Sequence, residues 1–113
     1  MTTINQNLPE ISFHEATLTA LSHIRPIVTL ALNDVCVSNV HKAVEVAIEE
    51  VRGVLRDDLP IEQLRMEMPD GEILTLREEN GHVILAVVWN DFAARRQETV
   101  VYTLLGARIV LRR

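Results

Sequence analysis

The sequence predicts a single α+β domain with a five-stranded antiparallel sheet and helices on its faces, in the order helix, two strands, helix, three strands, helix. Three observations predict this fold class. Apolar side chains recur at helical spacing over residues 40–56. The dipeptides Asp70-Gly71 and Asn80-Gly81 suit the tight turns that connect antiparallel strands. The run 83–89, VILAVVW, has no polar residue, which indicates a strand buried on both faces.

The chain is expected to form one domain, residues 11–113, after a flexible N-terminal segment, residues 1–10. That segment is polar and ends in Leu8-Pro9, and chain termini of this kind are commonly loose. The whole chain has 113 residues, which is enough for one hydrophobic core. Apolar residues make up 48% of it, so intrinsic disorder is excluded.

A first helix is predicted over residues 12–24. Ser12 and Glu15 have the spacing of a capping box, in which each side chain bonds the backbone amide of the other residue. Pro26 is expected to end this helix, because the residue before a proline is pushed toward extended geometry.

Residues 26–40 allow two interpretations. In the first, strands 27–32 and 35–39 flank a turn at Asn33-Asp34, which can adopt turn geometry. In the second, a long helix begins at Pro26 and runs into the helical pattern that follows. The density of β-branched residues favours the hairpin, and the long helix stays open as the alternative.

The helix predicted over residues 40–56 has an unusually wide apolar face. A weaker line of apolar residues runs beside its main stripe, and this line comprises Ala43, Val46, Ala47 and Val54. A helix that packs only on its own sheet needs a single stripe. The second line is therefore a candidate contact with another surface.

Three strands are predicted next, over residues 62–68, 72–79 and 82–89. In the first of them the apolar side chains share one face and alternate with charged ones, as in an edge strand; they are Leu64, Met66 and Met68. Asn90-Asp91 is expected to cap a final helix. Residues 106–113 are compatible with a weak continuation of that helix or with a last strand.

The composition excludes several classes of protein. The formal net charge is −5, whereas nucleic-acid-binding proteins usually carry a positively charged surface. No apolar run reaches the ~18 residues of a membrane-spanning helix, and the first ten residues do not resemble a signal peptide. The single cysteine, Cys36, cannot form an intramolecular disulfide and fits a reducing compartment. We therefore expect a cytoplasmic protein without a membrane span.

No residue pattern points to catalysis, a cofactor or a metal ion. The four histidines share no metal-ligand spacing with one another or with Cys36. Cys36 and His41 are five residues apart, but a nucleophile–base pair also needs an oxyanion site and an orienting acid, and neither is visible. The four glycines are isolated, so no phosphate-binding loop exists. The sequence thus predicts a non-enzymatic protein.

Residues 44–92 resemble the roadblock family, the superfamily of dynein light chains and bacterial gliding regulators. The resemblance is carried by the segment VEVAIEEVRGVL followed by LRMEMPDGEILTLREENGHVILAVVWNDF. It implies the fold described above, with the last strand at the centre of the sheet. It also implies an adaptor without an active site of its own, which scaffolds complexes or regulates a small Ras-like GTPase.

The same resemblance implies a homodimer that forms through residues 62–68 and 40–56. The predicted interface consists of the apolar residues already noted on these two elements, namely Leu64, Met66, Met68, Ala43, Val46, Ala47 and Val54.

A second resemblance covers residues 62–105 and is carried by the segment EILTLREENGHVILAVV and the ARRQ…LL pattern that follows it. These residues are similar to the C-terminal domain of flagellar hook-length and type III secretion needle-length control proteins. It suits the long-helix interpretation of residues 26–56. A third hypothesis is a small acidic immunity protein or secretion chaperone, whose negative charge complements a basic client. All three hypotheses expect a protein partner and differ in its identity.

Overall fold

The computed structural model of this chain describes residues 11–112 and shows an all-β protein. Ten strands form one antiparallel sheet, and residues 11–112 contain no helix. The strands are β1 (Ile11–Ser12), β2 (Thr17–Ile24), β3 (Ile27–Val37), β4 (Val40–Glu49), β5 (Gly53–Arg56), β6 (Leu59–Ile61), β7 (Asp70–Glu79), β8 (His82–Asp91), β9 (Arg96–Leu105) and β10 (Arg108–Arg112). The predicted α+β class is therefore wrong. The flexible segment predicted for residues 1–10 lies outside the described residues.

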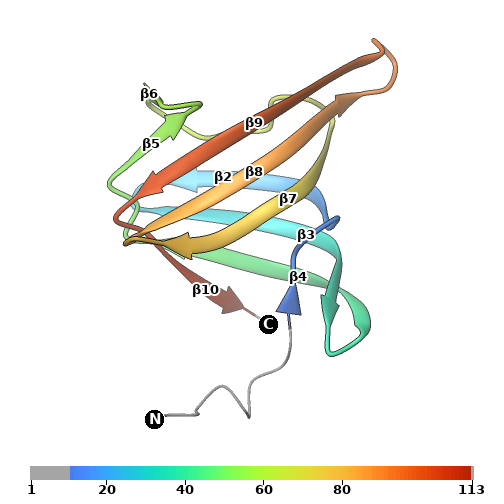
Figure 1. The fold of residues 1–113 in the computed structure, drawn as a ribbon, viewed down its shortest axis with the longest axis horizontal. Helices are drawn as coiled ribbons and strands as arrows, with labels where there is room; N and C mark the ends of the chain where they lie inside the picture. Colours follow the sequence, from blue (N-terminus) through green and yellow to red (C-terminus); the bar gives the residue numbers. More distant parts are fainter. Residues whose placement is uncertain (1–10, 113) are drawn as a thin grey trace.

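The sheet folds over so that its two halves face each other. The strand order is β10-β4-β3-β2-β7-β8-β9-β5-β6, with β1 paired to β3. The halves meet at the β2–β7 pair, where only Thr17–Glu72 and Leu18–Gly71 are aligned. In Figure 1 the strands β2, β3 and β4 lie behind β7, β8 and β9 and cross them at an angle. The core is enclosed between the two halves, as in crossed sheet packings.

The core is built from alternate residues of strands in both halves. In β3, Val28, Leu30 and Leu32 are buried, while the residues between them are only half-buried. The facing half contributes buried side chains from β7, β8 and β9, namely Ile73, Val83, Leu85, Val87, Trp89, Val100, Tyr102 and Leu104. This period of two follows from the alternation of side chains along a strand.

The helix predicted over residues 40–56 is replaced by β4 and β5. Residues four apart lie on the same face of a helix, but they also lie on the same face of a strand, because four is a multiple of two. Val44 and Ile48 satisfy both patterns, and Val46 between them shares their strand face. β-branched side chains lose rotamer freedom in a helix and pack well on a pleated surface, so this segment forms a strand.

The other two predicted helices are strands as well. Residues 12–24 contain the end of β1, a turn and β2, and Pro26 lies in the turn to β3. The Asn90-Asp91 pair caps no helix, because Asp91 Oδ1 accepts a hydrogen bond from the Ala94 backbone N–H at 3.1 Å in the turn between β8 and β9. Such a local bond can begin a helix or close a turn, so the dipeptide alone does not distinguish the two outcomes.

Of the two predicted tight turns, one is confirmed. Asn80 and Gly81 connect β7 to β8 with φ angles of 53° and 79°, as a type I′ turn requires. Asp70 and Gly71 do not form a turn. They begin β7 and are paired with Asn90 and Trp89 of β8.

Residues 27–37 form the single long strand β3 instead of a hairpin. The predicted turn at Asn33-Asp34 is an irregularity within the strand, where the register with β4 shifts and Asp34 has a φ of 60°. The chain turns later, at Ser38 and Asn39. The preference for β structure over a long helix is confirmed here, but the position of the turn was wrong. Residues 108–112, for which helix and strand were both open, form β10 beside β4.

Each end of the sheet has a feature that disfavours pairing with another chain. At one end, β6 is only three residues long and contains Pro60, which lacks a backbone N–H. At the other end, the Glu78 carboxylate accepts a hydrogen bond from the Ile109 N–H of β10 at 3.0 Å. Short edges, proline and edge charges are common devices against uncontrolled strand addition.

The apolar run 83–89 forms most of β8, which lies inside the sheet between β7 and β9. Its inward-facing side chains, such as Leu85, are fully buried in the core. The outward-facing Ile84 and Val88 are half-buried, and in Figure 1 no described element lies over this outer face. No helix in residues 11–112 is long and apolar enough to cross a bilayer.

Candidate functional site

Residues 62–69, named the strap here, connect β6 to β7 and close one end of the core. Leu64 is 1% exposed and Met68 is 9% exposed, whereas Met66 is half-buried. The strand predicted for residues 62–68 is wrong, because this segment has no strand pairing. The strap is held instead by two buried apolar side chains and by side-chain hydrogen bonds at both of its ends.

At the C-terminal end of the strap, a hydrogen-bond chain runs from the core to the surface. Trp89 Nε1–H donates to Tyr102 Oη at 2.9 Å, and Tyr102 Oη–H donates to the Glu67 carboxylate. Arg56 donates to both oxygens of the same carboxylate, with Nη2 to Oε1 at 2.7 Å and Nε to Oε2 at 2.9 Å. Arg56 Nη2 also lies 3.4 Å from Glu98 Oε1. A planar guanidinium fork and a hydroxyl together form a binding site for a carboxylate, and Glu67 occupies it.

Burial and these bonds shift the protonation of the three groups. Burial, reinforced by the hydrogen bond to Glu67, raises the pKa of Tyr102. Burial alone would raise the pKa of Glu67, but the hydrogen bonds from Arg56 and Tyr102 outweigh it and lower that pKa. The hydrogen bond to Glu67 raises the pKa of Arg56. At neutral pH the site therefore holds a neutral phenol, a carboxylate and a guanidinium.

At its N-terminal end the strap is held by residues at the end of β2. The Leu64 backbone N–H donates to His23 Nδ1 at 2.9 Å, and Gln63 Nε2 donates to the His23 carbonyl at 3.2 Å. Arg25 Nη2 donates to the Glu62 carbonyl at 2.9 Å. Because Nδ1 accepts, the neutral His23 ring carries its proton on Nε2. That nitrogen is buried and has no hydrogen-bond partner in the described part of the chain.

Burial lowers the pKa of His23, and the positive charge of Arg25 lowers it further. His23 is only 8% exposed, so its charged form loses hydration that no described hydrogen-bond acceptor at Nε2 replaces. A protonated ring would also place a proton on Nδ1, directly against the Leu64 N–H. The bond that fixes the strap at Leu64 therefore depends on a neutral His23.

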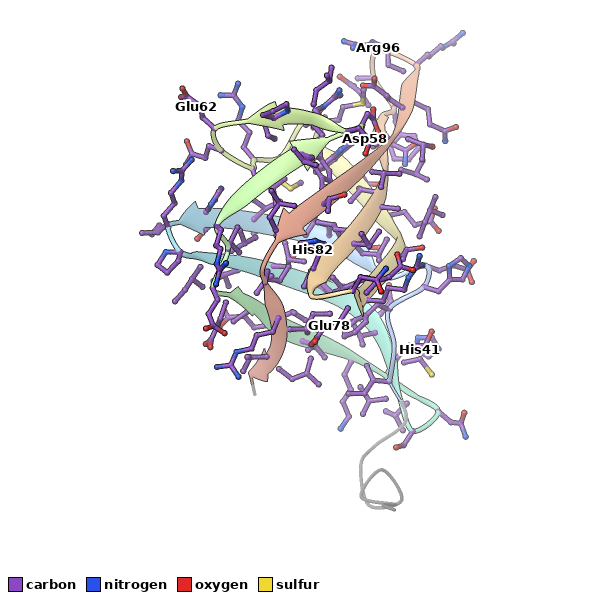
Figure 2. All side chains as sticks on the ribbon, turned by 60° about the vertical axis from the view of Figure 1, so that its left-hand side comes forward. His41, Asp58, Glu62, Glu78, His82 and Arg96 are labelled. Atoms are coloured by element: carbon purple, nitrogen blue, oxygen red, sulfur yellow. The ribbon has the colours of Figure 1, made fainter. Side chains whose placement is uncertain are left out.

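Two open cavities border the strap. One has a volume of about 510 Å³ and extends between the strap and the end of β5, where Arg56, Arg65 and Met66 line it. The other, of about 430 Å³, is lined by His23, Arg25 and strap residues. Glu62 and Gln63 border both cavities, and Figure 2 shows Glu62 at the periphery of the molecule. The strap is thus packed on its core side and bordered by open cavities at Glu62 and Gln63.

A second notable feature is the turn between β8 and β9, residues 91–96, named the tip here. The β8–β9 hairpin projects beyond the rest of the sheet in Figure 1, and Arg96 lies at its far end in Figure 2. Phe92 is 75% exposed at this turn. Arg95 and Arg96 are also exposed, and the side chain of neither makes a hydrogen bond or ion pair with any described residue. The tip therefore combines an exposed aromatic ring with two arginine side chains that form no ion pair within residues 11–112.

The tip is a defined turn. The Asp91 side chain accepts the Ala94 N–H, and the Phe92 carbonyl accepts the Arg95 N–H at 3.3 Å. Behind the turn, Gln97 Nε2 donates to Asn90 Oδ1 across the two strands at 2.9 Å. Cross-strand pairs of this kind stabilise a hairpin, so Phe92 is presented on an ordered support.

The predicted dimer-interface residues do not form an exposed patch. Five of them are buried inside the chain itself, namely Leu64, Met68, Val46, Ala47 and Val54. Met66 is half-buried, and Ala43 is exposed on β4. The homodimer itself stays a prediction.

The structure places Cys36 opposite His41 in the β3–β4 pair. The His41 ring is exposed, and its Nδ1 lies 3.4 Å from the Asp34 backbone carbonyl. Cys36 is a half-buried free thiol. Among residues 11–112, no three His, Cys, Asp or Glu side chains gather in a way that could hold a metal ion.

Sequence reasoning missed both the carboxylate site under the strap and the exposed tip. Phe92 directly follows the Asn90-Asp91 pair that was expected to cap a helix, and Arg56 is the last residue of the helix predicted over residues 40–56. The contacts of Arg56 with Glu67 and Glu98 join residues 11 and 42 positions apart, and no local pattern signals such pairs. Comparison of the chain with protein-family models, curated proteins and solved structures finds no match.

Proposed function

We propose that this chain is a non-enzymatic adaptor that binds a protein partner through the tip. The observation that carries the proposal is the exposure of Phe92 on an ordered, projecting turn. Burying a phenylalanine side chain in a partner is worth about 1.5–3 kcal/mol. An ordered tip loses little conformational freedom on binding, so most of that free energy remains available for affinity.

The charges beside Phe92 define the chemistry of the partner surface. Arg95 and Arg96 are unpaired within the described chain, and Asp91 is already engaged in closing the turn. Arginine and large aromatic residues are enriched among the residues that dominate binding energy at interfaces. The partner surface that fits the tip is an apolar pocket bordered by carboxylates, because opposite charges favour encounter and fix orientation.

A phospholipid surface is the competing class of target for an aromatic and two arginines. The formal net charge of the whole chain is −5, so an anionic bilayer would repel the molecule behind the tip. A protein partner does not repel the whole molecule in this way, because its acidic groups need to surround only the pocket that receives the tip. The observations therefore favour a protein.

The test compares wild type with Phe92→Ser and with Arg95→Glu/Arg96→Glu in affinity purification from native cells, quantified by mass spectrometry. Ile24→Ser is the matched control, since Ile24 is 76% exposed and lies at the end of β2, away from the tip. We expect one protein to be retained by wild type and Ile24→Ser and lost with both tip variants. With that protein purified, Phe92→Ser should weaken binding at least about tenfold, which corresponds to about 1.4 kcal/mol.

Equal retention of every captured protein by wild type and Phe92→Ser would overturn the proposal. Binding of the tip to anionic vesicles, with loss in both tip variants, would reassign the target to a membrane surface. The expected homodimer and the expected link to a small Ras-like GTPase remain predictions of the roadblock resemblance, and docking through the tip depends on neither.

A further inference from the structure

We propose that the strap is an internal occupant of a peptide-binding groove. The natural ligand of this groove would be an extended segment of another protein with the pattern apolar-x-x-acidic-apolar. The pattern is the one that the strap itself presents in Leu64, Glu67 and Met68. The proposal concerns a site separate from the tip and does not depend on the proposed docking function.

The groove recognises each element of this pattern with a different group. The acidic position is bound by the Arg56 fork, with Nη2 to Oε1 at 2.7 Å, and by the Tyr102 hydroxyl. Tyr102 is in turn fixed by the Trp89 indole N–H at 2.9 Å. Pairing a buried hydroxyl with a guanidinium in this way selects a carboxylate over an amide or an apolar group.

The two apolar positions of the pattern are recognised because their side chains are buried in the core. Leu64 and Met68 belong to the hydrophobic core cluster, although the backbone between them follows the surface. The first apolar position is also recognised through the main chain, since His23 Nδ1 accepts the Leu64 backbone N–H. A peptide backbone offers that N–H whatever its side chain, so this contact suits any extended segment.

The strap is attached in a way that permits exchange. Its described hydrogen bonds to the rest of the chain use side chains of His23, Arg25, Arg56, Gln63 and Tyr102, and no backbone–backbone bond joins residues 62–69 to the sheet. Open cavities of about 510 and 430 Å³ border it, and Glu62 and Gln63 line both of them. Segments with few backbone hydrogen bonds and low contact density open locally at less cost than global unfolding.

A segment from another protein would displace the strap and keep the same contacts. The displaced residues 62–69 remain tethered at Ile61 of β6 and Asp70 of β7, so the sheet stays intact. The strap competes with any external ligand, because its tether keeps it at a high effective concentration near the groove. Only ligands that bind more tightly than the strap can therefore displace it.

The test uses a fluorescently labelled synthetic peptide with the sequence of residues 61–70, IEQLRMEMPD. The protein variants are wild type and the double strap variant Leu64→Ser/Glu67→Gln, which leaves His23, Arg56 and Tyr102 intact. We expect the strap variant to bind the peptide at least tenfold more tightly than wild type. A control peptide with Leu64→Ser and Glu67→Lys should bind neither protein.

Three further substitutions in the strap variant assign the binding to the groove. Arg56→Gln added to the strap variant should abolish peptide binding. Arg77→Gln is the matched control, because Arg77 is an exposed arginine that pairs with Glu79 on β7, and it should change nothing. Phe92→Ser added to the strap variant should leave its affinity for the peptide unchanged. This result separates a failure at the groove from a failure at the tip.

A folded strap variant that binds both peptides equally, or neither, would overturn the proposal. If the strap variant does not fold, hydrogen exchange of wild type decides. Saturating IEQLRMEMPD should accelerate exchange of the 62–68 amides at least tenfold, and an unchanged rate would overturn the proposal. Dimerisation of the strap variant in light scattering would also overturn it, because the occupant would then be a second copy of this chain.

Discussion

Gly71 and Trp89 face each other across β7 and β8, and the indole fills the space that a side chain at position 71 would need. A Cβ placed on Gly71 would lie 3.0 Å from Trp89 Cζ3 and 3.1 Å from Val87 Cγ1. Gly71 lies within a strand and is needed there for a close approach, not for a turn.

Gly71→Ala should therefore destabilise the fold. Both neighbours are buried in the core, so the added methyl group must displace a packed side chain, at a cost of about 1–3 kcal/mol. Urea unfolding followed by Trp89 fluorescence measures the loss. Gly53→Ala is the matched control, because its Cβ would meet only Leu105 Cδ1 at an ordinary 3.5 Å. Equal losses in the two variants would contradict this account of Gly71.

Tyr102→Phe should lower stability although the ring remains. The substitution removes the hydroxyl between the Trp89 indole and Glu67, and it leaves the buried Nε1–H without a partner. An unsatisfied buried group of this kind costs about 1–3 kcal/mol. Chemical denaturation of Tyr102→Phe, Glu67→Gln and the double variant tests the network. Because both groups belong to one hydrogen-bond chain, the loss of unfolding free energy in the double variant should differ from the sum of the two single losses by about 0.5–3 kcal/mol. Strictly additive losses would contradict the network.

His23 should make stability fall on mild acidification. Its pKa is lowered in the folded chain by burial and then by Arg25, whereas the unfolded chain protonates it near the usual value of about 6.5. Unfolding therefore takes up a proton between the folded pKa and about 6.5. The stability that this group contributes is complete above that window and is lost as the pH falls through it.

The measurement is the free energy of unfolding at pH 7.5 and at pH values below 6.5. Wild type should lose stability over this range, and His23→Gln should lack that part of the loss because it cannot be protonated. His41→Gln is the control, since His41 is exposed on β4. A pH dependence that survives in His23→Gln but disappears in His41→Gln would show that the wrong histidine was assigned.

The two faces of β8 should respond differently to a charge. Leu85 is fully buried between the halves of the sheet, so Leu85→Asp should abolish folding. An unpaired buried charge costs several kcal/mol against a total stability of about 5–15 kcal/mol. Ile84 is only half-buried on the outer face, and Ile84→Asp should fold with a smaller loss. Circular dichroism and thermal unfolding compare them, and equally severe effects would mean that something covers the outer face.

Features with a local cause could be predicted from the sequence. Asn80-Gly81 forms the expected turn because the dihedral angles of two adjacent residues decide it, and these residues adopt positive φ at little cost. The strand over 82–89 was predicted because its apolar, β-branched composition suits a strand inside a sheet. The β character of residues 27–37 has the same origin.

The tertiary structure alone decided the rest, because the evidence for it lies between distant residues. Val44 and Ile48 fit a helix and a strand equally, and pairing of β4 with β3 and β10 selects the strand. The sequence alone predicts that Gly71 is a turn residue, but the structure shows that Gly71 leaves space for the Trp89 indole. The sequence alone places Glu67 on the polar face of an edge strand, but in the structure its carboxylate binds Arg56 and Tyr102. Local geometry determined the turn at Asn80-Gly81, and composition indicated the strands over 27–37 and 82–89. Long-range packing determined that the remaining apolar segments are strands and which of their faces are buried, and hence the strap and the exposed tip.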